Sequence, residues 1–275
     1  MRPEVQARLE PFFRTVALSP HAVLMLDYDG TLAPFRTRRD QAFPYPGVAL
    51  LLQEIVRNGR TRVLVISGRD VADLLPLLNI HPRPEMWGVH GLQRMRTDGT
   101  TEIPELGEAV LNALSDADRW LSYQQLRHRA EFKPGGIAVH WRGCAELMVE
   151  DIRSRVLLGW RLIAERGDLN LLEFDGGIEI RAREADKGDA VRAFLQNVPT
   201  GTPIAYLGDD TTDEAAFRAL GGHGTTILVR PEIRETAAQL WLRPPEEIVD
   251  FLGFWLKSCI QGSAFEGGAA RAVNG

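Results

Sequence analysis

The sequence predicts an α/β protein in which a doubly wound, Rossmann-like parallel sheet core carries an inserted α+β cap domain. Two observations predict this fold. From residue 21 onward, short apolar runs alternate with longer amphipathic segments, which is typical of parallel strands joined by crossover helices. Between about residues 98 and 183 this pattern stops, and helix-hairpin units replace it. The strand candidates of the core are residues 21–26, 62–66, 203–207 and 225–229.

Helical segments lie between these strands, and turn residues end two of them. The helix predicted over 46–57 is followed by Asn58-Gly59, and the helix predicted over 213–220 by Gly221-Gly222. Glycine and asparagine readily adopt the left-handed conformation that ends a helix. Two further helices are expected at 71–78 and 188–196. These elements predict an open sheet with helices on both faces.

The inserted segment contains a helix followed by a hairpin, twice. A helix over about 105–125 precedes two strands joined through Pro134-Gly135-Gly136, and a helix over about 145–165 precedes two strands joined at Asp175-Gly176. We therefore expect an antiparallel sheet of its own. The predicted core comprises residues 1–97 and 184–260, and the predicted cap comprises 98–183. Residues 261–275 contain few large apolar side chains and are predicted to be a flexible tail.

The composition excludes several classes of protein. The chain has 32 Lys and Arg against 37 Asp and Glu, a formal charge of −5, so it lacks the basic surface that nucleic acid requires. No stretch approaches the roughly 18 apolar residues of a membrane span, and no signal-peptide pattern begins the sequence, so we expect a cytoplasmic protein. Cys144 and Cys259 form no CxxC pair and are predicted to be reduced, structural thiols.

Two acidic residues follow the first predicted strand. Asp27 and Asp29 lie at its carboxyl end, where open α/β sheets bind their ligands. Two carboxylates one residue apart can approach the same hard cation, one through its side chain and the other through its side chain or backbone carbonyl. Such a pair is also typical of an Asx turn that closes a strand. The Gly30-Thr31-Leu32 that follows, together with motifs elsewhere in the chain, favours a cation site.

Two other helix starts carry residue types that bind phosphate. Ser67, Gly68 and Arg69 follow the second strand, where a hydroxyl, backbone amides and the helix dipole can hold a phosphate. Lys187 begins a later helix and can bring an ammonium group to the same phosphate. Taken alone, Ser67 is better explained as a helix N-cap, and Lys187 as an exposed lysine.

A second acidic run, at residues 207–214, follows another buried strand. Its carboxylates would repel one another without a cation, so Asp209 is a candidate metal ligand, with Asp210 and Asp213 beside it. Acidic residues in the first turn of a helix also complement the helix dipole, which is the role we expect for Glu214.

These motifs, in this order and all at strand ends, resemble the haloacid dehalogenase superfamily of phosphohydrolases over about residues 20–250. The resemblance implies that Asp27 is a nucleophile that carries a transient aspartyl phosphate, and that Asp29 is the general acid and base. It implies Mg²⁺ as the cofactor, held by Asp27, Asp29 and Asp209 and supported by Thr31, Asp210 and Asp213. It implies phosphate binding by Ser67, Gly68, Arg69 and Lys187.

Other segments resemble one family within this superfamily. The pieces DYDGTL, SGR, GVHG, KPGGIAVHWR, EIR, KG and GDDTTDE look like those of trehalose-6-phosphate phosphatases. The resemblance implies that residues of the cap hold the glucose ring distal to the phosphate, and that core residues line the facing side. The implied cap residues are Glu131, Lys133, Arg142 and Glu179, and the implied core residues are His90 and Gly91.

Strand alternation and chain order bear on these cap residues as well. Glu131 and Lys133 are two apart and share one face of a strand. From spacing alone, a solvent-exposed hairpin face with cross-strand ion pairs is the simpler interpretation, and His140 is more typical of a packed or surface residue than of a ligand. The insertion of the cap between Ser67 and Lys187 predicts that it covers the phosphate site as a lid.

The resemblance implies hydrolysis of trehalose 6-phosphate, a small sugar phosphate, with a trehalose-6-phosphate synthase as a functional partner. Other functions remain open from the sequence. They are a phosphatase for sucrose phosphate or a glycosyl-phosphoglycerate, a phosphomutase, and a non-catalytic sugar-phosphate sensor. The intact pair of Asp27 and Asp29 favours an enzyme over a sensor.

Overall fold

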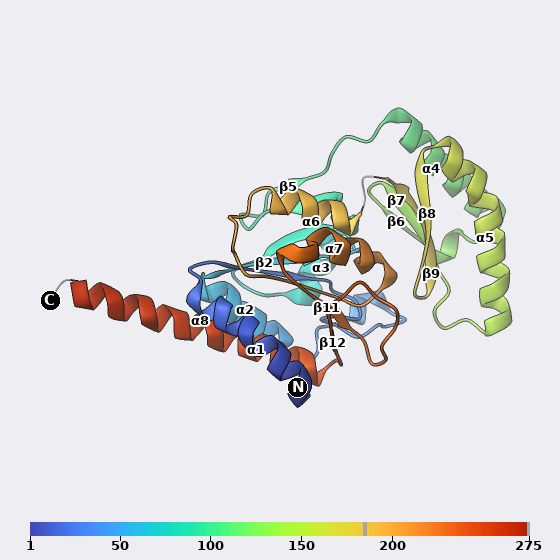
Figure 1. The fold of residues 1–275 in the computed structure, drawn as a ribbon. Coiled ribbons are helices and arrows are strands. Elements are labelled where there is room, and N and C mark those ends of the chain that lie inside the picture. The colour runs from blue at the N-terminus through green and yellow to red at the C-terminus, as the bar shows by residue number, and fades with distance from the viewer. Residues whose placement is uncertain (184–185, 274–275) are drawn as a thin grey trace.

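The chain forms two β-sheets in this computed structural model (Figure 1). The structure describes the backbone of residues 1–183 and 186–273, and the side chains of these ranges up to residue 262. An eight-stranded sheet forms the core, and a four-stranded sheet with two long helices forms a second unit, which we call the cap.

The core sheet is parallel over most of its width. Six strands run parallel. At one edge β4 pairs antiparallel with β3 and β5 pairs antiparallel with β4, because short hairpin connections, not crossover helices, link these three strands. In spatial order the strands are β12 (Leu240–Leu242), β11 (Thr225–Val229), β10 (Ile204–Gly208), β1 (Ala22–Leu26), β2 (Thr61–Ile66), β3 (Glu85–Gly88), β4 (Gln93–Met95) and β5 (Thr101–Glu102).

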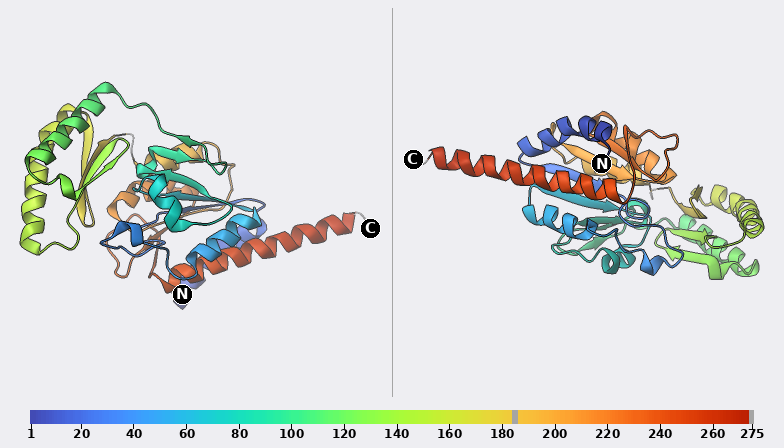
Figure 2. Two further views of the ribbon diagram at one scale, coloured as in Figure 1. Left: turned by 180° about the vertical axis from the view of Figure 1, so that it is seen from behind. Right: turned by 90° about the horizontal axis from the view of Figure 1, so that it is seen from below.

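Helices cover both faces of the core sheet, as the doubly wound class predicts (Figure 2). Successive residues of β1 point to opposite faces, so Leu24 and Leu26 pack with one group of helices while Val23 and Met25 pack with the other. The first group is α1 (Pro3–Leu18), α2 (Val48–Asn58), α3 (Val71–Leu78) and α8 (Glu246–Val273). The second group is α6 (Lys187–Leu195) and α7 (Glu214–Leu220).

The cap has the predicted succession of helix and hairpin, twice. Its strands pair antiparallel throughout, and Ile137, Val139 and Ile178 pack against the two helices. The strands, in spatial order, are β6 (Ala130–Lys133), β7 (Gly136–His140), β9 (Gly177–Ala182) and β8 (Leu169–Phe174), and the helices are α4 (Glu108–Tyr123) and α5 (Glu146–Arg166). On the face away from the helices, Glu131 and Glu179 each pair in register with Ala138.

The predicted boundaries compare with the structure as follows. The core sheet continues to β5, beyond the boundary predicted at residue 97. The boundary predicted after 183 falls on residues 184–185, which lie outside the described residues. Helix α8 enters the segment 261–275, whose side chains are described only to residue 262, so the flexible tail stays a prediction.

Several elements carry no clear periodic signal in the sequence. Strands β3, β4 and β12 have three or four residues each, and β3 begins with the buried Glu85, whose carboxylate pairs with Arg62 and Arg94.

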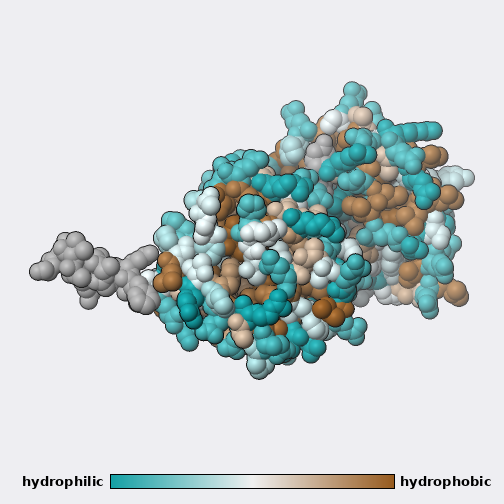
Figure 3. Space-filling view, viewed as in Figure 1, coloured by the Kyte–Doolittle hydropathy of each residue, from teal (hydrophilic) through white to brown (hydrophobic). Residues whose placement is uncertain are grey.

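Within the described ranges, no helix is both long and apolar enough to cross a membrane. On the surface of the cap, apolar side chains lie among polar ones (Figure 3), and α5 exposes Leu147 and Leu158.

Candidate active site

Asp27 lies at the carboxyl end of the central strand β1. Its backbone N–H donates to Leu207 O (2.8 Å), and its buried carboxylate accepts from Thr31 Oγ1 at 3.1 Å. Gly30 has a φ of +84°, and a Cβ there would lie 2.1 Å from Asp209 Oδ2. Only glycine therefore lets the loop after β1 approach the loop after β10 this closely.

Three buried carboxylates meet at this point. Asp27, Asp209 and Asp213 each place an oxygen within 4.8 Å of the other two. Burial raises the pKa of Asp27 to about 7, although the charge of Lys187 opposes the shift. Burial and the charge of Asp27 also raise the pKa of Asp209 well above its ordinary value. This excess of negative charge, presented entirely by oxygen atoms, fits a hard cation such as Mg²⁺.

The ammonium group of Lys187 spans two of these acids. Lys187 Nζ donates to Asp27 Oδ1 at 2.6 Å and to Asp213 Oδ1 at 2.7 Å. Burial acts to lower the pKa of Lys187, but the charges of Asp213 and Asp27 outweigh burial and raise it. The side chain is 3% exposed, so the alternative of a solvent-exposed lysine is wrong.

Ser67 lies in a rigid loop after β2, and it is not the N-cap of α3. That cap is Asp70, whose side chain accepts from Ala72 N at 2.8 Å. Val89 and His90 have φ of +49° and +56°, values that are strained for residues other than glycine. Their N–H groups donate to the carbonyls on either side of Gly68, Val89 N to Arg69 O and His90 N to Ser67 O, both at 2.8 Å. The strained turn therefore holds the Ser67 loop in place.

Arg69 and Asp29 bind each other. Arg69 Nε and Nη2 donate to the two oxygens of Asp29, both at 2.6 Å, and Nη1 donates to Arg39 O at 2.9 Å. We predicted Arg69 as a phosphate ligand and Asp29 as a metal ligand. The carboxylate of Asp29 is outside the acid cluster, whose third member is Asp213.

Glu179 is the centre of a buried charged group on the cap. Its Oε2 lies 2.9 Å from His90 Nε2 and 3.3 Å from Arg181 Nη1, and its Oε1 forms an ion pair with Lys133. Burial lowers the pKa of His90 to about 3, so the imidazole is neutral. Lys133 Nζ also donates to Gly68 O at 3.0 Å, which joins the cap to the loop after β2.

Two further contacts join the cap to the core. Glu131 pairs with Arg39 and accepts from His140 Nε2 at 2.8 Å, while its Oε1 is buried with no hydrogen-bond partner among the described residues. Arg142 lies over the Phe35 ring, 4.0 Å from its centroid. Because Lys133 and Glu179 are buried as well, the alternative of a solvent-exposed hairpin face is wrong.

The two sheets enclose one pocket that contains most of the predicted residues. Side chains of the core loops and of the cap line it together, and their convergent polar groups suit a small polar molecule. Of the predicted residues, only Thr31, Gly91 and Asp213 do not line it. Thr31 and Asp213 contact residues that do, whereas Gly91 packs against Ala190 of α6.

Several residues of the pocket were not predicted. Phe35, Arg36 and Arg39 belong to a loop with no periodic pattern, and their place depends on the cap above them. His140 was interpreted as a packed or surface residue, but it lines the pocket and binds Glu131. The remaining unpredicted residues are Phe174 and Thr212.

Comparison with known proteins agrees with this geometry. The family model described as trehalose-phosphatase matches residues 25–239. The chain belongs to the trehalose-phosphatase family. It is 32% identical over 252 residues to a trehalose-phosphate phosphatase of Mycobacterium marinum, and 30% identical over 224 residues to the trehalose-6-phosphate phosphatase of Escherichia coli K12. These alignments cover 85% and 79% of the chain. The chain spans 61% of the M. marinum relative and 82% of the E. coli relative.

Solved structures in and near the trehalose-phosphatase family have the same fold. The C-terminal domain of the Candida albicans trehalose-6-phosphate phosphatase superposes with a TM-score of 0.76 at 19% identity, covering 90% of this chain and 96% of that one. A haloacid dehalogenase-like hydrolase from Bacillus subtilis gives a TM-score of 0.55 at 16% identity, covering 84% and 98%. The predicted fold class is confirmed.

Proposed function

We propose that this chain is a Mg²⁺-dependent phosphatase that hydrolyses trehalose 6-phosphate to trehalose and phosphate through an aspartyl-phosphate intermediate. The position of Asp27 carries the proposal. A carboxylate is buried against Lys187 at the base of a pocket, and the opposite wall of that pocket is a polar face of the cap. Family membership and the names of the relatives support the same function.

In the first half-reaction, an oxygen of Asp27 attacks phosphorus and the bond from phosphorus to the sugar oxygen breaks. To act as the acid, the carboxyl of Asp29 must leave its ion pair with Arg69 and carry a proton, which it gives to that oxygen, so trehalose leaves neutral. In the second half-reaction, a water molecule attacks the phosphorus of the aspartyl phosphate, Asp29 takes a proton from the water, and the bond to Asp27 breaks. Both aspartates return to their starting protonation states.

The negative charge of the phosphate must be neutralised before a carboxylate can attack it. Lys187 supplies one positive charge beside Asp27, and the Ser67 hydroxyl and nearby amides can bind the phosphate oxygens. Asp27 and Asp209 would hold Mg²⁺, with a backbone carbonyl from Asp29. Bound there, Mg²⁺ supplies charge neutralisation of the phosphoryl oxygens and of the acid cluster.

The cap supplies groups that suit the hydroxyls of a disaccharide. Glu131 has an unpaired acceptor, and Lys133 and Glu179 add a donor and an acceptor. Because each buried polar group needs a partner, a sugar that satisfies these groups is preferred to one that leaves them unpaired. Lys133 also contacts Gly68 O, so sugar binding and the closed position of the cap are linked.

A phosphate-release assay tests the function directly. Trehalose 6-phosphate would be compared with sucrose phosphate, a glycosyl-phosphoglycerate and a small aryl phosphate, for the wild-type protein and for Asp27→Asn. We expect turnover of trehalose 6-phosphate by the wild type only. Preference for another sugar phosphate would overturn the substrate, and phosphate release by a folded Asp27→Asn protein would overturn the nucleophile. A cytoplasmic location and a trehalose-6-phosphate synthase partner remain predictions.

A further inference from the structure

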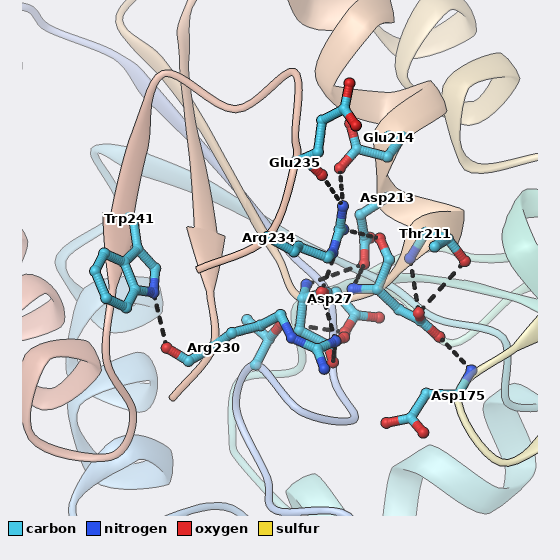
Figure 4. Close-up of polar contacts among 12 residues, drawn as sticks. Asp27, Asp175, Thr211, Asp213, Glu214, Arg230, Arg234, Glu235 and Trp241 are labelled. Carbon is cyan, nitrogen blue, oxygen red and sulfur yellow. Dashed lines mark hydrogen bonds and ion pairs between the residues drawn. The ribbon is translucent and has the colours of Figure 1, made fainter. Parts of the chain in front are cut away.

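The loop between β11 and β12 contacts the proposed cation site from outside the pocket (Figure 4). Its central contact is Arg234, whose Nη2 donates to Asp210 O at 2.8 Å and to Asp209 O at 3.3 Å. A second arginine from the same region, Arg230, donates from Nη1 to Asp209 O at 3.3 Å. Two guanidinium groups therefore meet the carbonyl of a proposed cation ligand.

The N–H groups of the same dipeptide are also held. The N–H groups of Asp209 and Asp210 both donate to Asp213 Oδ2, at 3.1 and 3.0 Å. The N–H groups of this dipeptide thus face Asp213, and its carbonyls face Arg234. The peptide group between Asp209 and Asp210 is held on both sides and cannot rotate without breaking hydrogen bonds to charged partners. The direction in which Asp209 projects its carboxylate depends on this arrangement.

Arg234 is itself fixed by Glu214, at the start of α7. Arg234 Nη1 lies 2.5 Å from Glu214 Oε1 and donates to Glu235 O at 2.8 Å. The other oxygen of Glu214 accepts from Ala237 N at 2.8 Å. Burial acts to raise the pKa of Glu214, but the bonds from Ala237 and Arg234 outweigh burial and lower it, so the pair is ionised. The role predicted for Glu214, a complement to the helix dipole, is therefore incomplete.

Neither arginine touches the pocket. Arg230 and Arg234 do not line it, and their side chains are mostly buried, with 29% and 23% exposed. Arg234 contacts the loop that carries Asp209 through its backbone carbonyls, whereas Arg230 contacts the Asp209 carbonyl and also lies 4.0 Å from Asp209 Oδ2. Both arginines therefore act on Asp209, and Arg234 acts through the backbone.

We propose that Arg234, held by Glu214, is a positioning residue that presents the carboxylate of Asp209 to the catalytic cation. The inference rests on the cation site of the proposed function. Without the guanidinium, Asp210 O loses its charged partner and Asp209 O keeps only the bond from Arg230, so the dipeptide can turn. Asp209 then spends part of the time directed away from Asp27, and cation binding must first restore its position.

The test measures Mg²⁺ binding by isothermal titration calorimetry in the absence of substrate. Arg234→Met keeps an unbranched apolar stem and removes the charge and donors, and we expect Mg²⁺ to bind about tenfold more weakly or worse. Arg234→Lys restores the charge but not the fork of donors, and we expect part of the loss to be recovered. Arg192→Met, which removes an exposed ion pair with Asp189 on α6, is the matched control and should bind as the wild type does.

Activity assays add a second readout. In Arg234→Met, raising the Mg²⁺ concentration should restore turnover, with the KM for the sugar phosphate unchanged at saturating Mg²⁺. The Glu214→Gln variant should weaken Mg²⁺ binding by a smaller factor, and the double variant should be no worse than Arg234→Met, because Glu214 acts through Arg234. The double variant leaves no buried unpaired charge, so it decides the question if Arg234→Met does not fold.

The outcomes separate this inference from the proposed function. Wild-type Mg²⁺ affinity in a folded Arg234→Met or double variant would overturn the positioning role and leave the function standing. A lower melting temperature with unchanged Mg²⁺ affinity would overturn it too, since Arg234 would then serve stability alone. If the wild-type protein itself binds no Mg²⁺, both the proposed cofactor and this inference are wrong.

Discussion

Replacing Asp27 with asparagine should stabilise the protein when no divalent cation is present. The carboxyl group has an ordinary pKa of 3.8, and burial raises the pKa of Asp27 to about 7 in the folded protein. Between these pH values Asp27 has lost its proton in the unfolded chain and retains it in the folded chain. The contribution of Asp27 to the unfolding free energy therefore falls as pH rises from about 4 to about 7, by about 1.36 kcal/mol per pH unit.

Relative to low pH, the buried Asp27 carboxyl lowers the unfolding free energy by about 4 kcal/mol at pH 8 and by about 2 kcal/mol at pH 5.5. Asparagine carries no charge at either pH, its amide oxygen can accept from Lys187, and its amide nitrogen can donate to Thr31 Oγ1. The Asp27→Asn protein should therefore exceed the wild type in unfolding free energy by about these amounts. Added Mg²⁺ should narrow the difference, because a cation bound to the acid cluster stabilises the wild type more.

Urea denaturation at pH 8 and pH 5.5 measures these differences, in chelator and in Mg²⁺. Subtracting the wild type removes the contributions of His90 and His140, whose pKa values are also displaced but are common to both proteins. Asp189→Asn, at an exposed ion pair, is the control and should change stability by no more than about 0.5 kcal/mol. The reasoning fails if Asp27→Asn is less stable than the wild type in chelator at pH 8, or if its advantage does not shrink at pH 5.5.

Four further predictions concern individual contacts. Lys187→Met removes the cation between Asp27 and Asp213 and should destabilise the fold by about 3–5 kcal/mol in urea denaturation; a change below about 1 kcal/mol would contradict the buried pairing. Asp29→Asn should slow hydrolysis of trehalose 6-phosphate more than hydrolysis of an aryl phosphate, whose leaving group needs no proton, and equal losses in kcat would remove Asp29 from the acid role. Glu131→Ala should lower kcat/KM for trehalose 6-phosphate about tenfold and spare the aryl phosphate. Lys133→Ala should lower kcat/KM for both substrates, because Lys133 also holds Gly68 O, and an unchanged aryl phosphatase rate would show that this contact has no catalytic effect.

Much of the fold could be predicted because its signals are local. The central strands are continuous apolar runs, and glycines end helices where they were expected. Gly59 follows α2 with a φ of +78°, and Gly221 follows α7 with a φ of +47°. The short strands at the sheet edges were missed because three or four residues do not establish a period, and a buried acid such as Glu85 is polar in the sequence. Its partners, Arg62 and Arg94, are 23 and 9 residues away in the chain.

The sequence by itself determined which side chains stand at the ends of the core strands, because in a parallel sheet these positions follow directly from the order of strands and helices. Asp27, Ser67 and Asp209 were placed at one edge on that ground. Only the tertiary structure decided which charges meet. That Arg69 holds Asp29, and that Arg234 holds the carbonyl of Asp209, depends on distances across 40 and 25 residues of chain. Contacts between distant segments are set by packing and strand register. An arginine in a loop belongs to no periodic pattern, so the sequence does not indicate its partner.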